Sequence, residues 1–249
     1  MQTVYDKAQA FYEKGMFHEA LGLFHEMADS WPDFSVLNYI GCCYIGTKDY
    51  KTAESVFNEL ISEAPDWERP YFNLARVYLA VDKDREAYEL LKRAIEINPF
   101  DEDSYFYMGV YYRKKSMWNE AVDCFLKSEK LNTEDFEVHL NLSACYAAIG
   151  DCEKALTKAL KALEIDPEGS DAVFNVSKIL IDRKEYERAF HLLYENRAVI
   201  GDDIGLLKNL FRSALKAGNL DVCTETAQTI LSLDQNDLMM KRFLDDVKD

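Results

Sequence analysis

The sequence contains little proline and little glycine, 5 and 10 residues among 249. All-β proteins need many turns, which use these two residues, so their scarcity favours helices. No apolar run approaches the roughly 20 residues that a membrane span needs. The first ten residues carry neither a basic segment nor an apolar one, so we expect no secretory signal. The sequence therefore predicts a cytoplasmic helical protein that does not bind membranes.

Positive charge is also scarce, because 29 basic residues face 45 acidic ones and the formal net charge is −16. Neutralising phosphates needs a basic surface or stripe, so this balance argues against a nucleic-acid partner. Phosphate-binding glycine loops of the GxxxxGK[ST] and GxGxxG types are missing, and so is an HExxH zinc motif. We therefore expect no enzyme activity, no cofactor and no metal.

The six cysteines lack the CxxC spacing of redox and zinc sites. In a chain without an export signal they are expected to be reduced, buried, small apolar residues. They are Cys42, Cys43, Cys124, Cys145, Cys152 and Cys223.

A repeat of 34 residues runs through the chain. One column of small residues recurs with spacings of 33 and then 34, and its members are Ala20, Ala53, Ala87, Ala121, Ala155, Ala189 and Cys223. Twelve places after this column stand Pro32, Pro65, Pro99 and Pro167. Each unit also holds two segments whose apolar residues follow the 3.6-residue helical period. The repeat therefore predicts a series of helix pairs.

The turn within a pair and the end of a pair have their own signals. Gly15, Gly150 and Gly218 share one column between the two helices, where a left-handed helix stop is expected. Asn98 precedes Pro99 and is expected to end its helix, because the residue before proline disfavours the α region.

A second small-residue column lies in the first helix of each pair. We expect it to let the two helices approach closely, since a larger residue would overpack the contact. Its members include Gly41, Ala75, Gly109 and Ser143. His139 occupies a bulky column of the same helix and is expected to be a packed core residue.

Taken together, these columns resemble the tetratricopeptide repeat, with a bulky residue, a small residue and tyrosine in the first helix, followed by glycine, alanine, phenylalanine and proline. Segment 68–101 matches nearly every place, whereas 170–203 and 204–237 match less well. Gly201 stands where proline is expected, and Phe211 stands where a small residue is expected. The expected repeats are 1–33, 34–67, 68–101, 102–135, 136–169, 170–203 and 204–237.

The resemblance implies an all-α, right-handed superhelical solenoid of antiparallel helix pairs, with a concave and a convex face. We expect one continuous domain over residues 1–249. Residues 238–249 are expected to form a capping helix, in which Phe243, Leu244 and Val247 cover the last repeat.

In this family the first helix of each repeat lines the concave groove. The resemblance therefore implies a peptide-binding surface, on which aromatic rings offer contact area at low entropic cost. Asparagine side chains there could donate to and accept from a peptide backbone. The implied residues are Tyr39, Arg69, Phe72, Asn73, Arg76, Phe106, Tyr107, Arg113, Lys114, Asn141, Asn175, Lys178 and Asn209.

The basic residues of this surface suggest the chemistry of the partner. Arg69, Arg76, Arg113 and Lys114 favour a partner peptide with an anionic segment, because arginine in a partly desolvated groove favours carboxylates. The full set of lysines and asparagines that clamps a chaperone tail in related co-chaperones is not present, although Asn73 fits one of its places.

The leading interpretation is a non-enzymatic scaffold that binds another protein. One alternative is a self-associating structural subunit, since apolar residues lie at both ends of the array. A second alternative is a helical-repeat RNA-binding protein, which the 34-residue period and the net charge of −16 disfavour.

Overall fold

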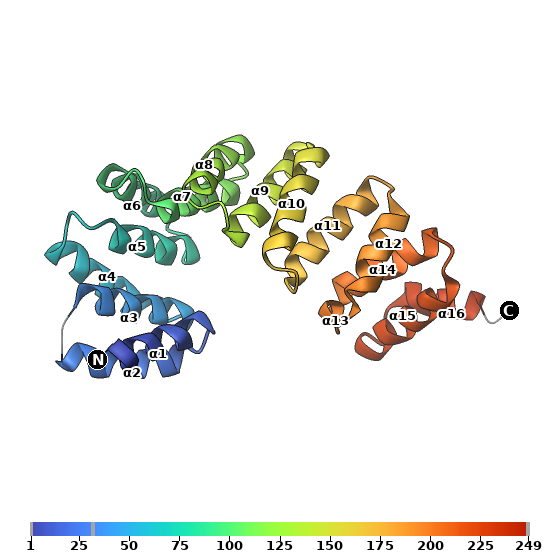
Figure 1. Cartoon of the computed structure of the whole chain (residues 1–249), viewed down its shortest axis with the longest axis horizontal. Helices are drawn as coiled ribbons and strands as arrows, with labels where there is room; N and C mark the ends of the chain where they lie inside the picture. The colour runs from blue at the N-terminus through green and yellow to red at the C-terminus, as the bar shows by residue number, and fades with distance from the viewer. Residues whose placement is uncertain (1, 31–32, 248–249) are drawn as a thin grey trace. The chain divides into compact units, whose positions relative to one another are not determined.

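The computed structural model describes residues 2–30 and 33–247, and in these ranges it contains sixteen α-helices and no strand. The expected all-α fold is confirmed. The helices fall into two compact units, residues 1–131 and 132–249, each of which is a stack of helix pairs (Figure 1). The single continuous domain stays a prediction.

The first unit holds four helix pairs, one for each of the first four repeats. They are α1 (Gln2–Glu13) with α2 (Phe17–Ser30), α3 (Phe34–Gly46) with α4 (Tyr50–Glu63), α5 (Glu68–Ala80) with α6 (Asp84–Ile97), and α7 (Glu102–Lys114) with α8 (Trp118–Leu131).

The second unit continues the same pattern and ends on a single helix. Its helices are α9 (Phe136–Ile149) with α10 (Cys152–Ile165), α11 (Ser170–Asp182) with α12 (Tyr186–Glu195) and the short α13 (Arg197–Ile200), α14 (Ile204–Lys216) with α15 (Leu220–Leu233), and α16 (Leu238–Asp246).

Successive pairs pack against one another in chain order. The first helices of neighbouring pairs contact each other, α3 with α5 and α5 with α7 in the first unit, α9 with α11 and α11 with α14 in the second. The second helices do not contact one another to the same extent. The first helices therefore line the inner face of each unit.

All seven turns within pairs have the same backbone conformation. The expected glycines, Gly15, Gly150 and Gly218, have φ of 72°, 91° and 79°. In the other four repeats a non-glycine residue takes the same left-handed place, namely Lys48, Asp82, Ser116 and Lys184. Each turn is closed by a hydrogen bond from the next residue to the carbonyl five places before it, as in Lys83 N to Tyr78 O at 2.8 Å.

The expected close approach within pairs is present. A β-carbon at Gly41 would lie 2.6 Å from the ring of Phe57, and one at Gly109 would lie 2.7 Å from the ring of Phe125. Where the first helix carries Ala75 instead, the second helix carries the smaller Leu91. The volume removed from one helix is thus filled by the other.

The two weakly matching repeats differ in structure from the others at the positions where their sequences depart from the repeat pattern. In 170–203 the second helix ends at Glu195, and the short α13 follows it. Gly201 then stands in place of the expected proline and has a φ of 47°. In 204–237 the large and the small side chain have exchanged helices. The bulky Phe211 lies on the first helix and Ala227 on the second. Both side chains are buried in one cluster.

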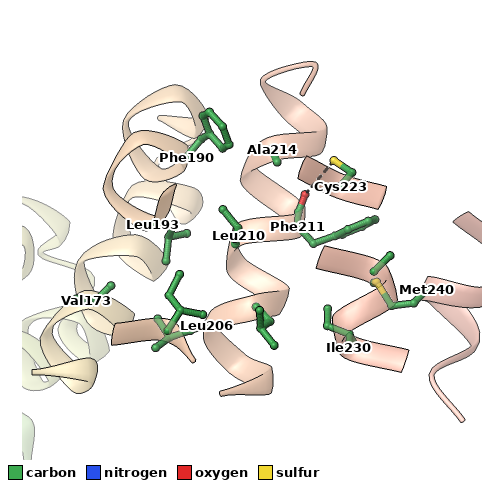
Figure 2. Packing of buried hydrophobic residues seen from close by; sticks show 13 residues of the cluster. Val173, Phe190, Leu193, Leu206, Leu210, Phe211, Ala214, Cys223, Ile230 and Met240 are labelled. Atoms are coloured by element: carbon green, nitrogen blue, oxygen red, sulfur yellow. Dashed lines mark hydrogen bonds between the residues drawn. The ribbon is translucent and has the colours of Figure 1, made fainter. Parts of the chain in front are cut away.

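Figure 2 shows this cluster in the second unit, where Leu206, Leu210 and Phe211 of α14 point toward residues of α12, α15 and α16. The thiol of Cys223 donates to the carbonyl of Phe211 at 3.8 Å. Met240 of α16 is buried in the same cluster.

The expected capping segment corresponds to α16. Phe243 and Leu244 pack on the last repeat, but Val247 is exposed because α16 ends at Asp246, one residue before it. Residues 248–249 of the expected cap and Pro32 of the expected proline column lie outside the described residues.

The remaining expectations concern cysteines, His139 and membrane spans. Cys152 is exposed, contrary to expectation, because it begins α10 on the outside of its turn. His139 is buried, as predicted, and its Nε2 lies 2.9 Å from the carbonyl of Thr133. Within the described part of the chain, every helix is too short or too polar to cross a bilayer.

Candidate inner-face site

A polar cluster lies on the inner face of the first unit, where α3 and α5 meet. Asn73 of α5 is buried and donates through Nδ2 to Oδ1 of Asn38 on α3 at 3.0 Å. The Oδ1 atom of Asn73 accepts a hydrogen bond from Nη1 of Arg76 at 2.8 Å. The Asn38–Asn73 pair therefore fixes the position of the guanidinium one helical turn away.

Arg76 is held on three further sides. Its guanidinium lies over the ring of Tyr107 on α7, 5.0 Å from the centroid, and Nη1 lies 4.0 Å from Sγ of Cys42 on α3. The Tyr12 hydroxyl of α1 also acts on it electrostatically and raises its pKa. First helices of all four repeats thus meet at this one side chain.

The guanidinium stays charged although it is largely buried. Burial lowers the pKa of Arg76, but Tyr107, Cys42 and Tyr12 together raise it above its ordinary value. Among the described residues no carboxylate lies within ion-pair distance of Arg76. A partly buried cation that is held by neutral groups at hydrogen-bond distance can accept an external anion without breaking an existing ion pair.

Aromatic rings flank this cation on both sides. Phe72 stacks on Tyr107 at 5.9 Å, and Phe106 meets Tyr107 edge-on at 5.0 Å. On the other side Tyr39 packs edge-on against Tyr12 at 5.4 Å. Burial is the main cause that raises the pKa of Tyr39. These rings give the inner face a rigid apolar wall on either side of Arg76.

Asp103 at the start of α7 is an acidic group that interacts electrostatically with Arg76 and Cys42. Burial raises the pKa of its carboxyl to about 6, with a further rise from Asp101 and Glu102. Arg76 and Arg69 act in the opposite direction. Asp103 therefore titrates just below neutral pH, where its charge opposes the binding of an anion.

The other predicted basic residues of the first unit, Lys114, Arg113 and Arg69, are not buried in the cluster. Lys114 is held at the α5–α6 turn, where its Nζ lies 2.8 Å from the carbonyl of Leu79, 2.5 Å from Asp82 Oδ1 and 2.9 Å from Asp84 Oδ1. Its charge is balanced within the chain. Arg113 and Arg69 are exposed.

The four predicted residues of the second unit do not form an open row of asparagine side chains. Asn209 donates to Ser177 Oγ at 3.1 Å, and Asn141 donates to the carbonyl of Glu137 at 2.8 Å. Asn175 is half-buried and Lys178 is exposed. The structure brings Tyr39, Phe72, Asn73, Arg76, Phe106 and Tyr107 together in the first unit.

The predicted residue set omitted three members of the cluster, Tyr12, Asn38 and Cys42. They stand at the twelfth, fifth and ninth places of their repeats, which are groove-lining places in the family named above. Asn38 shares the fifth place with the predicted Phe72 and Phe106, so the signal for this residue is present in the sequence.

The chain is similar in sequence to proteins of a known repeat family. Models of the tetratricopeptide repeat match residues 5–66 and 44–107. Anaphase-promoting complex subunit 3 of Schizosaccharomyces pombe is 22% identical over 202 residues, which cover 80% of this chain and 30% of that protein. The chain spans only 10% to 30% of the length of the first three curated relatives it matches.

Two solved structures share the fold. One, from a study of Pseudomonas aeruginosa pilF, superposes with a TM-score of 0.75 at 16% identity and covers 86% of this chain and 97% of its own. The other, YrrB, described as a TPR protein with an unusual peptide-binding site, has a TM-score of 0.64 at 18% identity and covers 75% and 96%.

Proposed function

Because this chain belongs to the tetratricopeptide repeat family, we propose that its first unit is a non-enzymatic protein-interaction scaffold that binds an acidic segment of another protein along the inner face of α3, α5 and α7. The similarity to a subunit of a large complex and to a protein whose structure is described by its peptide-binding site supports binding of a protein partner. A side-chain or C-terminal carboxylate of that segment binds Arg76.

One observation carries this proposal: Arg76 is a largely buried cation held by neutral groups. Asn73 and Cys42 accept from Nη1 only, so other guanidinium N–H groups remain for a ligand. The rings of Phe72 and Tyr107 would exclude water from the new ion pair and thereby strengthen it.

The test starts from a partner captured by affinity purification and mapped to a peptide by cross-linking and mass spectrometry. Calorimetry then compares the unchanged chain with Arg76→Gln, which keeps a polar side chain of similar reach but loses the charge. We expect the affinity to fall by about tenfold or more, since a hydrogen bond to a charged group contributes about 1.5–3 kcal/mol.

Arg85→Gln is the matched control, because Arg85 is an exposed residue of α6, outside the inner face. Circular dichroism checks that each variant is folded. If Arg76→Gln destabilises the fold, the exposed Arg69→Gln tests the same face at a smaller expected loss. Equal affinity of the Arg76, Arg69 and Arg85 variants for the mapped peptide would overturn the assignment.

A further inference from the structure

An open apolar pocket of about 440 Å³ lies between α14 and α16 in the second unit. Phe211 and Leu215 line it from α14, and Leu238, Met239 and Phe243 line it from α16, together with Arg242 and Asp246. Leu238, Met239 and Leu215 are 75%, 59% and 39% exposed. Three large apolar side chains next to one another in contact with water mark a surface suited to binding.

The helical register explains why this pocket is open. The edge-on contact between Phe211 and Phe243, with ring centroids 4.9 Å apart, fixes α16 against α14. On α14, Leu215 lies one turn after Phe211 and so faces the same side. Leu215 is partly exposed and lies between the buried Ala214 and the exposed Lys216. It therefore stands where the buried face of α14 meets the solvent.

Positive residues lie on both helices of the pocket, although the chain as a whole carries −16. Arg242 lines the pocket, and Arg212 lies one turn before Lys216 on the exposed stripe of α14 beside Leu215. Among the described residues neither Arg212 nor Arg242 forms an ion pair. Lys208 is paired with Asp237 at 2.9 Å, and Asp246 is the acidic residue of the lining.

From this geometry we propose that the α14–α16 pocket binds a bulky apolar side chain of an acidic peptide segment in a partner protein. The apolar side chain covers Leu215, Met239 and Phe243, and flanking carboxylates of the segment meet Arg212 and Arg242. Charge complementarity selects an acidic partner, while burial of the apolar group provides most of the affinity. This site extends the proposed scaffold function to the second unit.

The test pans a phage-displayed library of random 12-residue peptides on the full chain. We expect one class of enriched peptides to carry Leu, Met or Phe flanked by Asp or Glu. Labelled peptides of this class are then titrated by fluorescence polarisation against Met239→Ser and Arg212→Gln. The serine variant should weaken binding about tenfold, in line with the loss of one central apolar contact, and added salt should weaken binding further.

Leu160→Ser is the matched control, because Leu160 is an exposed leucine of α10 in the same unit. Met239 is itself exposed, so its substitution should leave the fold intact. Peptides that lose affinity with Arg76→Gln but not with Met239→Ser would support the first site and overturn this one. Enrichment of basic peptides, no enrichment, or a chain dimer that Met239→Ser dissolves in light scattering would also overturn it.

Discussion

The ring of Phe125 fills the space that a side chain at position 109 would need, since a β-carbon on Gly109 would lie 2.7 Å from its Cε1 atom. Gly109→Ala should therefore destabilise the first unit by about 1–3 kcal/mol through overpacking, although alanine is the better helix former. Urea unfolding followed by circular dichroism measures the change.

Two variants show whether volume is the cause. Gly22→Ala on the exposed face of α2 meets nothing within 4 Å and should stabilise by about 0.5–1 kcal/mol. Phe125→Leu recreates the Ala75–Leu91 arrangement of the preceding repeat and should recover part of the loss in Gly109→Ala. A double variant no more stable than the sum of its single changes would argue against volume exchange.

The left-handed turn residues offer a gain in stability. Lys184 has a φ of 62°, which costs an ordinary residue about 1–2 kcal/mol relative to glycine. Lys184→Gly should raise the free energy of unfolding by about 0.5–1 kcal/mol after the entropic cost of glycine. Lys51→Gly, in the exposed part of α4, should lower it by about 1 kcal/mol. Thermal melts in which both variants shift the melting temperature in the same direction would contradict this account.

Asn73 forms hydrogen bonds with both Arg76 and Asn38, so its substitution should remove two stabilising interactions. Asn73→Ala should destabilise the first unit by about 2–3 kcal/mol, because a charged donor and an amide both lose a partner. Asn38→Ala removes one bond and should cost about 1 kcal/mol. Native-state hydrogen exchange of α3 and α5 measures both losses. The comparison is the exposed Asn58→Ala, which removes only a bond to the Glu54 carbonyl within α4.

Asp103 should make stability depend on pH. Its pKa is raised to about 6, mainly by burial, from an ordinary value of 3.8. The folded chain therefore holds the proton more tightly than the unfolded chain. The contribution of Asp103 to stability falls as pH rises from about 4 to about 6, by at most about 3 kcal/mol.

Asp103→Asn removes this titration. Its free energy of unfolding should exceed that of the unchanged chain at pH 7 and should match it near pH 3.5. Urea titrations at a series of pH values measure the difference. A constant difference across this range would show that Asp103 has an ordinary pKa.

The end of α6 at Ile97, just before Asn98, could be predicted because it depends on residues within one repeat, namely Asn98 and Pro99. The left-handed turns at Gly15, Gly150 and Gly218 were predictable for the same reason. Lys48 and Lys184 adopt the same conformation, yet their residue type gives no hint of it; only their column does. Local chemistry and repeat position together thus account for the fold.

The site was less predictable because it depends on how neighbouring repeats meet. The pairing of Asn38 with Asn73 joins residues 35 places apart, and its hydrogen bonds follow from inter-repeat register. Lys114 was placed on the correct helix, but its long side chain reaches back to Asp82 and Asp84 in the preceding repeat. Sequence gives the helix face of a lysine and not the direction in which it extends.

The reversal of Phe211 and Ala227 has a consequence for how such a protein can change. The large side chain has moved from the second helix to the first, and both positions are buried in one cluster. A single pair can therefore accumulate compensating substitutions without forcing its neighbours to adjust, because contacts in such arrays extend only to adjacent units. The residues that bind a partner along the inner face can thus change one helix pair at a time, while the stacking of the pairs stays the same.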